Sequence, residues 1–294
     1  MTEAIFAVDL GATWLRSALV DPARRLAMKA VAATPDRAAD ACAIIDAAWR
    51  RAGCPRAVAL ASAPELTADA MVRRWPNRRA YEGGSLLSTT IRDAAVVAMV
   101  DDAAAAAIAA HPFERRDAGP TICISIGSGI GGGAVIDGVP LTGANGAAMD
   151  LGHMPVPSAT GLRCSCGRVG CLQAAASGFA LRDLVAASPD ALLQSPDVAS
   201  ALQRASAALG EAIVIVNAVF DPARIAIAGG LGLSPLFDQI EAELIARHIT
   251  VSIARHRCGD DAGLVGAAIG FGLNRTAPGR VGHDNQERVV SHAD

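Results

Sequence analysis

The segment IFAVDLGATWLRSALV, residues 5–20, decides the fold, because it places a tight polar turn between two apolar runs. Residues 5–8 and 17–20 have the length and composition of buried strands, and Gly11 lies between them. The simplest interpretation is a β-hairpin with Gly11 at its turn. A second strand, turn and strand follow about 115 residues later, over residues 121–126, 127–133 and 134–136.

Both turns carry groups that suit phosphate binding. The run GSGIGGG at 127–133 has five glycines in seven residues, and glycines let backbone N–H groups approach an anion closely. In the first turn, Asp9 can orient Mg²⁺ through water, and Thr13 and Arg16 can donate hydrogen bonds. The alternative for each turn is an ordinary hairpin connection. As a pair, the two turns predict one phosphate-binding turn in each of two lobes.

The rest of the chain alternates between strand-like and helix-like segments. Strands are expected at 57–61, 95–100, 225–228 and 250–253, and helices at 38–51, 103–110, 178–187, 200–219 and 236–247. Residues 67–88 are irregular, 111–120 form the best linker candidate, and the polar residues after 276 predict a disordered tail.

Composition limits the class of protein. With 294 residues and 52% hydrophobic residues, the chain exceeds the usual size of a single core, which favours two lobes. A net charge of −3 and a pI near 6.1 argue against nucleic acid as a partner, and no GxxxxGK phosphate loop occurs. Apolar runs such as 122–126 are too short for a membrane span, and the N-terminus lacks the features of a signal peptide. Seven cysteines fit a reducing compartment, so we expect a cytoplasmic protein.

Three of those cysteines lie in the run HMPVPSATGLRCSCGRVGC, residues 153–171. His153, Cys164, Cys166 and Cys171 supply the four ligands of a tetrahedral Zn²⁺, and glycines between them allow a tight loop. The alternative is a group of buried thiols with a satisfied histidine. Because four protein ligands leave no open position for water, the expected zinc is structural.

Asp102 follows the expected strand at 95–100 and precedes an alanine-rich helix. A carboxylate there can cap the helix, which is the structural alternative. The functional interpretation is a general base that takes the proton of a hydroxyl while that oxygen attacks a γ-phosphate.

Together these motifs resemble the ROK family (repressor, open reading frame, kinase), a group of sugar kinases within the actin and hexokinase superfamily. The segment from Asp9 to Arg16 is similar to the family's DxGxTxxR motif, 127–133 to GTGIGGG, and CSCGRVGC to its CxCGxxGC zinc motif. The segment DDAAA at 101–105 resembles Asn-Asp-Ala-Asn-Ala, which places the base at Asp102. The segments 143–153, 225–232 (with Asn217, Asp221 and Pro222) and 262–272 are similar to further family patterns.

The resemblance implies a two-lobed α/β fold of the actin-like ATPase (ribonuclease H-like) type with a zinc-binding loop. We expect a smaller lobe over 1–115, completed by a helix near 262–274, a larger lobe over 116–275, and a tail over 276–294. The implied cofactors are ATP, Mg²⁺ and structural Zn²⁺. The substrate is a small sugar whose primary, 6-type hydroxyl is phosphorylated, and the implied assembly is a homodimer without nucleic acid or membrane partners.

Each implied role falls on particular residues. The expected catalytic residue is Asp102, and the expected substrate contacts are Asp101, Asp150, His153, Gln173 and Glu65. The expected phosphate and ATP contacts are Asp9, Gly11, Thr13, Arg16, Gly127, Ser128, Gly129, Gly131, Gly132, Gly230 and Gly232.

Most departures from the family pattern fall on the sugar contacts. Asp101 and Ala104 stand where the family has Asn, Asp150 and Gln173 where it has Glu, and Glu65 brings an extra acid. A site built for particular hydroxyls rejects analogues that leave its polar groups unpaired, so these changes favour an amino sugar or a cyclitol over plain glucose. The alternatives are neutral drift in a hexose kinase and a catalytically silent sugar-binding regulator. A repressor is disfavoured, because the first strand begins by about residue 4, without a preceding helix-turn-helix.

Overall fold

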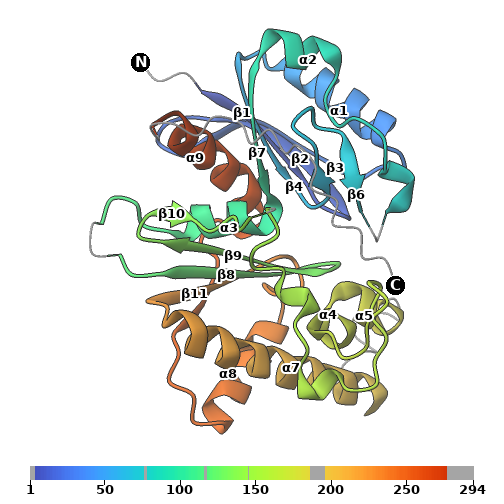
Figure 1. Cartoon of the computed structure of the whole chain (residues 1–294), viewed down its shortest axis with the longest axis vertical. Coiled ribbons are helices and arrows are strands. Elements are labelled where there is room, and N and C mark those ends of the chain that lie inside the picture. Colours follow the sequence, from blue (N-terminus) through green and yellow to red (C-terminus); the bar gives the residue numbers. More distant parts are fainter. Residues whose placement is uncertain (1–3, 76–77, 116–117, 145, 186–195, 277–294) are drawn as a thin grey trace, which may run out of the picture.

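The computed structural model describes residues 4–75, 78–115, 118–144, 146–185 and 196–276. Within them, two five-stranded mixed sheets lie one above the other, with helices between and outside them (Figure 1). The two sheets have the same topology: a three-stranded antiparallel meander followed by two parallel strands on the side of the first strand.

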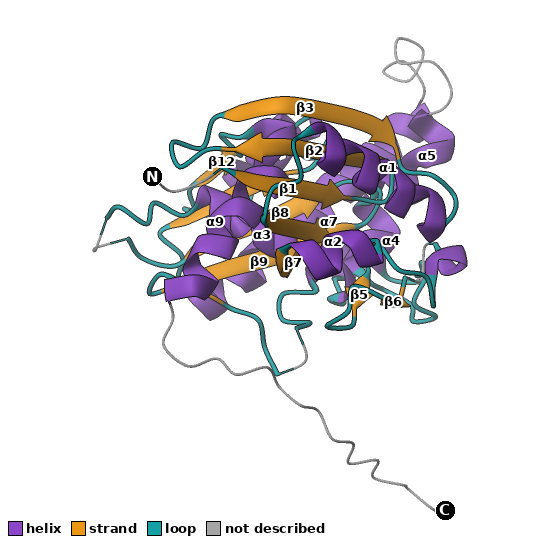
Figure 2. Ribbon diagram, turned by 90° about the horizontal axis from the view of Figure 1, so that it is seen from above, coloured by secondary structure: helices purple, strands orange, loops and turns teal. Residues whose placement is uncertain are grey.

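The N-terminal sheet has the order β3-β2-β1-β4-β7, and Figure 2 shows β3 at its outer edge. Its strands are β1 (Ile5–Leu10), β2 (Trp14–Val20), β3 (Leu26–Ala33), β4 (Ala57–Ser62) and β7 (Val96–Asp101). The antiparallel pairing of β1 with β2 confirms the predicted hairpin, and the Gly11 N–H donates to Trp14 O across it at 3.0 Å.

Side chains alternate along β1 because successive residues of a strand point to opposite faces. Phe6, Val8 and Leu10 belong to the cluster formed with α1 (Ala38–Arg51) and its Ile45 and Trp49. On the other face, Ala7 packs with the C-terminal helix α9 (Ala262–Thr276). Small residues on that face let α9 approach the sheet closely. The remaining elements of this half are β5 (Glu65–Leu66), β6 (Val72–Arg74), the 3₁₀ turn Arg79–Tyr81 and α2 (Thr89–Ala94).

The C-terminal sheet has the order β10-β9-β8-β11-β12. Its strands are β8 (Thr121–Ile126), β9 (Ile130–Ile136), β10 (Val139–Pro140), β11 (Arg224–Ala228) and β12 (Ile253–Arg255). The isoleucines of β8 pack against α7 (Pro196–Phe220) and α8 (Leu236–Ala246). Between β10 and α7 lie the 3₁₀ turns Leu151–His153 and Pro157–Ala159, α4 (Leu172–Ala176) and α5 (Gly178–Val185), and a further 3₁₀ turn, Gly259–Asp261, precedes α9.

Helix α3 (Asp102–Ala110) lies between the two sheets together with α9 (Figure 1). It packs on the face of the C-terminal sheet that carries Cys123 and Ala226, and Ala105 contributes to the cluster against β4. The helix that begins with Asp102 is therefore held from both sides.

Several expected boundaries were wrong, since β2 already begins at Trp14 and α7 at Pro196. The glycine-rich turn is short, because β9 already begins at Ile130 and includes Gly131 and Gly133. A Cβ on Gly133 would lie 2.5 Å from Ala103 O, so glycine is required there for the approach of α3 to the sheet. The strand expected at 250–253 is instead β12, and it begins where the expected one ends. The predicted tail lies outside the described residues.

Helix α7 contains one stretch, Val198–Phe220, that is long and apolar enough by composition to cross a membrane. Leu209, Ile213 and Val216 of this stretch are fully or almost fully buried in the cluster beneath β8. Burial in this core explains part of the apolar character of α7, whereas Val214, Ile215 and Val219 on the same helix are exposed.

Candidate active site

The hairpin of β1 and β2 places a buried carboxyl next to a guanidinium, because Asp9 and Arg16 are paired across it. The side chain of Asp9 lies close to α9, since a Cβ on Gly263 would be 2.5 Å from the Asp9 carboxyl carbon. Arg16 Nη1 lies 3.8 Å from Asp9 Oδ2. Burial raises the pKa of Asp9 to about 6; Arg16 opposes this shift, and the carboxylates of Asp261 and Asp260 add to it. Such a carboxyl gains from a nearby cation.

The two glycine turns meet although they are far apart in sequence. Thr13 Oγ1 and Ser128 Oγ are 2.5 Å apart, so the hydroxyls expected to bind phosphate lie side by side. Ser128 also fixes the start of α5, because its carbonyl accepts a hydrogen bond from Phe179 N at 3.0 Å. The fold therefore brings the tips of the hairpins of both sheets to one place.

The predicted phosphate glycines divide into two groups. A Cβ on Gly127 or Gly230 would meet no atom within 4 Å, so open space adjoins the backbone at these positions. A Cβ on Gly131, Gly132 or Gly232 would instead come within 2.9 Å or less of neighbouring protein atoms. Close packing explains glycine in the second group, whereas the first group leaves room for a ligand. Gly129 closes the turn by accepting a hydrogen bond from Gly127 N at 2.9 Å.

Asp101 and Asp102 occupy the junction of β7 and α3. Asp101 is the N-cap, because its Oδ1 accepts hydrogen bonds from the N–H groups of Ala103 and Ala104, both at 3.0 Å. The capping role considered for Asp102 thus belongs to Asp101. Asp102 is the first residue of the helix, and its Oδ1 lies 2.8 Å from Ala103 N.

Both carboxyls have raised pKa values. For Asp101, burial raises the pKa most, followed by the charges of Asp102 and Asp150. For Asp102, burial again comes first and the charge of Asp9 second. Asp101 retains an exposed surface, so water screens part of the effect on its pKa. The arrangement concentrates negative charge beside a half-buried Asp102.

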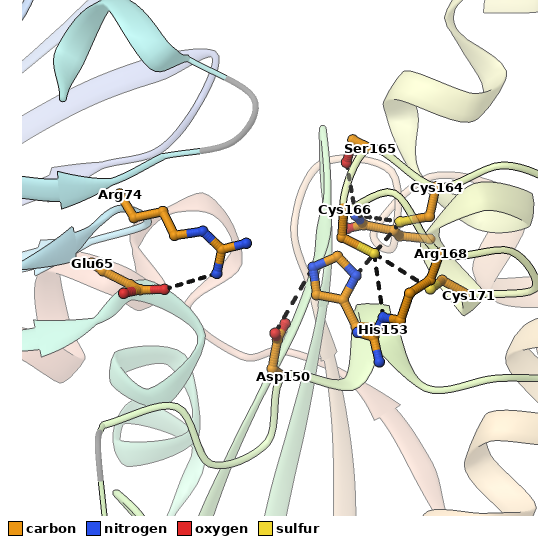
Figure 3. A network of polar contacts seen from close by, with 10 residues as sticks. Glu65, Arg74, Asp150, His153, Cys164, Ser165, Cys166, Arg168 and Cys171 are labelled. Atoms are coloured by element: carbon orange, nitrogen blue, oxygen red, sulfur yellow. Dashed lines mark hydrogen bonds and ion pairs between the residues drawn. The ribbon is translucent and has the colours of Figure 1, made fainter. Parts of the chain in front are cut away.

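The cluster formed by His153, Cys164, Cys166 and Cys171, here called the Cys/His cluster, has all four ligand atoms within 4.8 Å of one another (Figure 3). The Cys166 and Cys171 sulfurs are 3.8 Å apart, and Cys164 Sγ lies 3.5 Å from His153 Nδ1. The other ring nitrogen, Nε2, lies 3.9 Å from Asp150 Oδ2. His153 therefore joins the cluster to a predicted substrate contact.

Two other predicted sugar contacts already have protein partners. Gln173 Nε2 lies 3.3 Å from Cys164 Sγ and 3.2 Å from Ser165 Oγ, which places this amide on the Cys/His cluster. Glu65 forms ion pairs with Arg73 at 2.9 Å and Arg74 at 3.4 Å. In Figure 3 Glu65 and Arg74 lie to the left of Asp150 and His153.

Sequence analysis missed the residues that line a cavity of about 670 Å³ next to Thr13 and Ser128. The cavity is also lined by Ala12, Ala33, Thr34, Asp36, Arg78, Arg79, Ala80 and Phe179. Arg78 is held in place, since its Nε donates to Ala12 O and its Nη1 to Pro35 O, both at 2.8 Å. Apart from Ala12, which belongs to the motif from Asp9 to Arg16, these residues lie outside the motifs recognised in the sequence, and their only signal was the pair of adjacent arginines.

The architecture fits the actin-like ATPase fold. It has two mixed sheets of equal topology whose hairpin tips meet, and α3, which begins with Asp102, lies between them. Residues 5–271 match the ROK family, and the chain belongs to that family, which confirms the resemblance drawn from the motifs. The chain is 32% identical to an N-acetylmannosamine kinase of Salmonella typhi over 291 residues, covering 90% of this chain and 96% of the relative.

Solved structures agree with this assignment. A ROK family glucokinase from Streptomyces griseus, solved in complex with glucose and AMPPNP, has a TM-score of 0.73 and 26% identity, over 90% of this chain and 98% of that one. A ROK family transcriptional regulator, a homolog of the E. coli MLC protein, has a TM-score of 0.70 and 24% identity, over 92% of this chain and 78% of that one. The regulator supports the fold alone.

Proposed function

We propose that this protein transfers the γ-phosphoryl group of ATP to the primary hydroxyl of a hexose or hexose-like sugar, with Asp102 as the general base. The class, an ATP-dependent sugar kinase, follows from membership of the ROK family and from its kinase relatives. One observation supports the detailed proposal: the fold brings the two predicted phosphate turns and Asp102 together. The hydroxyl oxygens of Thr13 and Ser128 are 2.5 Å apart, and Asp102 begins the helix that packs between the two sheets.

The phosphates of ATP would lie along the two hairpin turns, where the hydroxyls of Thr13 and Ser128 offer hydrogen-bond donors and the backbone at Gly127 adjoins open space. Gly11 lies in the first turn, Arg16 lies in the adjoining strand β2, and the open space beside the Gly230 backbone suits the nucleoside side. Asp9, whose pKa is raised by burial, would orient Mg²⁺. A magnesium ion held by Asp9 would neutralise charge on the phosphates. Asp102 would accept the proton of the sugar hydroxyl as its oxygen attacks phosphorus.

The Cys/His cluster fits structural Zn²⁺. Bonds of about 2.3 Å to sulfur in a tetrahedron separate the ligand atoms by about 3.8 Å, which agrees with the 3.8 Å between Cys166 and Cys171. His153 would bind through Nδ1, leaving Nε2 toward Asp150. A carboxylate beside the second ring nitrogen is the usual way of orienting a metal-bound histidine. The zinc would thus hold a sugar-contacting segment in place.

An amino sugar or a cyclitol is the second candidate substrate. The charges of Asp102 and Asp150 both raise the pKa of Asp101, so three carboxyl groups lie on the acceptor side of the site. An ammonium group on the substrate would offset this charge and stabilise the ionised form of Asp102. The organisation of two lobes divided near residue 115, a homodimeric assembly and a cytoplasmic location remain parts of the proposal.

The test is turnover of ATP with a panel of hexoses, N-acetylated and free amino sugars, and cyclitols. Asp102→Asn should lower kcat by about 10²–10⁴-fold, the usual contribution of a general base, while the protein remains folded. Equal and negligible ATP consumption by wild type and Asp102→Asn across the panel would favour the sugar-binding regulator.

Asp101→Asn separates the two substrate classes. If an ammonium group is recognised, the variant should lose about tenfold in kcat/KM for a free amino sugar, as expected for one charged hydrogen bond of about 1.5 kcal/mol, and little for the plain hexose. Parallel losses for both acceptors would contradict charge recognition by Asp101.

A further inference from the structure

A buried histidine outside the set of predicted site residues contacts the helix that carries Asp102. His256 follows β12 and is only 4% exposed. Its Nε2 lies 2.9 Å from the carbonyl oxygen of Ala106, a residue of α3 that is 150 positions away in sequence. Its Nδ1 lies 3.1 Å from the N–H of Cys258.

These partners determine the state of the imidazole. A carbonyl oxygen can only accept a hydrogen bond and a backbone N–H can only donate one. The proton therefore sits on Nε2, which donates to Ala106 O, and Nδ1 accepts from Cys258 N. Burial lowers the pKa of His256, which favours the same neutral form.

His256 is itself anchored to the C-terminal sheet. Its backbone N–H donates to Ile227 O of β11 at 2.8 Å. The chain of contacts thus runs from the sheet that bears the second phosphate turn, through the imidazole, to α3. Ala106 lies one helical turn after Asp102, so the hydrogen bond fixes the helix close to its functional end.

The other contacts of α3 restrain it differently. On the sheet side, a Cβ on Gly131 would lie 2.9 Å from Ala103 Cβ, and on the α9 side, a Cβ on Gly266 would lie 1.7 Å from Ala105 O. These contacts between backbone and small side chains set how far α3 lies from its neighbours. They are nondirectional, and alanine surfaces offer few ridges that resist sliding along the helix axis. A directional hydrogen bond at Ala106 supplies that restraint.

We infer that His256 is a positioning residue for the proposed phosphoryl transfer, since it fixes α3 and thereby Asp102 relative to the phosphate turn at Gly127 and Ser128. The inference rests on the proposed function of Asp102. Its physical basis is that a general base misplaced by about 1 Å can lose about 10²-fold in rate.

Two substitutions separate the two hydrogen bonds. In His256→Gln the side-chain amide nitrogen is as many bonds from Cβ as Nε2, so the donor to Ala106 is kept and the acceptor at Nδ1 is lost. In His256→Asn the side-chain oxygen replaces Nδ1, so the acceptor for Cys258 is kept and the donor to Ala106 is lost. The two variants are matched in polarity and charge.

We expect His256→Asn to lower kcat by about 10- to 100-fold with the KM for ATP and for the sugar within about threefold of wild type. His256→Gln should keep kcat within about threefold of wild type. If the Asn and Gln variants have equal kcat values, or if Gln is the more impaired, His256 serves only the loop at Cys258 and the inference is overturned.

A second readout does not depend on turnover. Hydrogen exchange followed by mass spectrometry should show faster exchange in α3 for the Asn variant than for the Gln variant. Identical exchange in α3 for both variants would also overturn the inference. Because this comparison needs no substrate, failure of the proposed kinase activity in the wild-type protein is recognised separately.

Discussion

The contact between α3 and α9 predicts opposite effects for two glycine substitutions in one helix. A Cβ on Gly266 would lie 1.7 Å from Ala105 O, whereas a Cβ on Gly270 would meet only the flexible end of Ile108 at 3.5 Å. A carbon–oxygen contact needs about 3.3 Å, so Gly266→Ala forces the two helices apart by about 1.6 Å. Gly270→Ala requires no movement.

The magnitudes follow from these distances. Overpacking lowers the free energy of unfolding by about 1–3 kcal/mol. Gly266→Ala belongs at the upper end of this range, because the added Cβ meets a backbone carbonyl oxygen that cannot move away by changing a side-chain rotamer. The gain in helix propensity offsets about 1 kcal/mol of this cost. Gly266→Ala should therefore destabilise the protein by about 2 kcal/mol, and Gly270→Ala should stabilise it by about 0.5–1 kcal/mol.

Calorimetry measures the difference directly. At about 2–4 °C per kcal/mol for a chain of this size, the Tm values of the two variants should differ by about 5–12 °C. Displacement of α3 should also lower kcat in Gly266→Ala far more than in Gly270→Ala. Equal Tm values, or a Gly266→Ala protein more stable than wild type, would refute the close contact of α3 with α9.

Three further predictions concern the ionisable groups. The folded-state pKa of Asp9, about 6, lies above the ordinary 3.8, so the folded protein binds this proton more tightly than the unfolded chain does. The free energy of unfolding should therefore fall by about 3 kcal/mol as pH rises from about 4 to 6. Urea unfolding should show a weaker fall for Asp9→Asn, and parallel pH curves for the variant and the wild type would exclude Asp9 as the cause. Burial and the charge of Asp9 raise the pKa of Asp102, so kcat/KM should rise with pH through the neutral range, and a flat profile would argue against Asp102 as base. A strong chelator should remove one zinc per chain and lower Tm by about 5 °C or more, whereas Cys166→Ser with full zinc content would contradict the proposed ligand set.

Local patterns in the sequence were enough to predict most elements. The expected helix over 38–51 and strand over 121–126 coincide with α1 and β8. The hairpin at Gly11 was also predicted, because apolar runs on both sides of a polar turn allow few other arrangements. The Cys/His cluster was recognisable for the same reason: its members are close in sequence, so any compact loop brings them together.

Positions that depend on contacts over more than a hundred residues were not predictable. Ser128 was expected to bind phosphate, but nothing in its segment indicates that its hydroxyl meets Thr13. Gly131 was assigned to a turn, although it lies in a strand beneath α3. The capping role considered for Asp102 belongs to Asp101, because the choice between neighbouring carboxyls depends on where the helix begins.

The sequence by itself determined the family, the two hairpins, the metal-type cluster and the acid that begins α3, because each is encoded in a short run of residues. Only the tertiary structure decided which glycines face open space, that Gln173 lies on the Cys/His cluster, and that His256 holds α3 at Ala106. The physical reason is that such contacts arise from the packing of α3 and α9 between two sheets, and the spacing of residues along the chain carries no record of that packing.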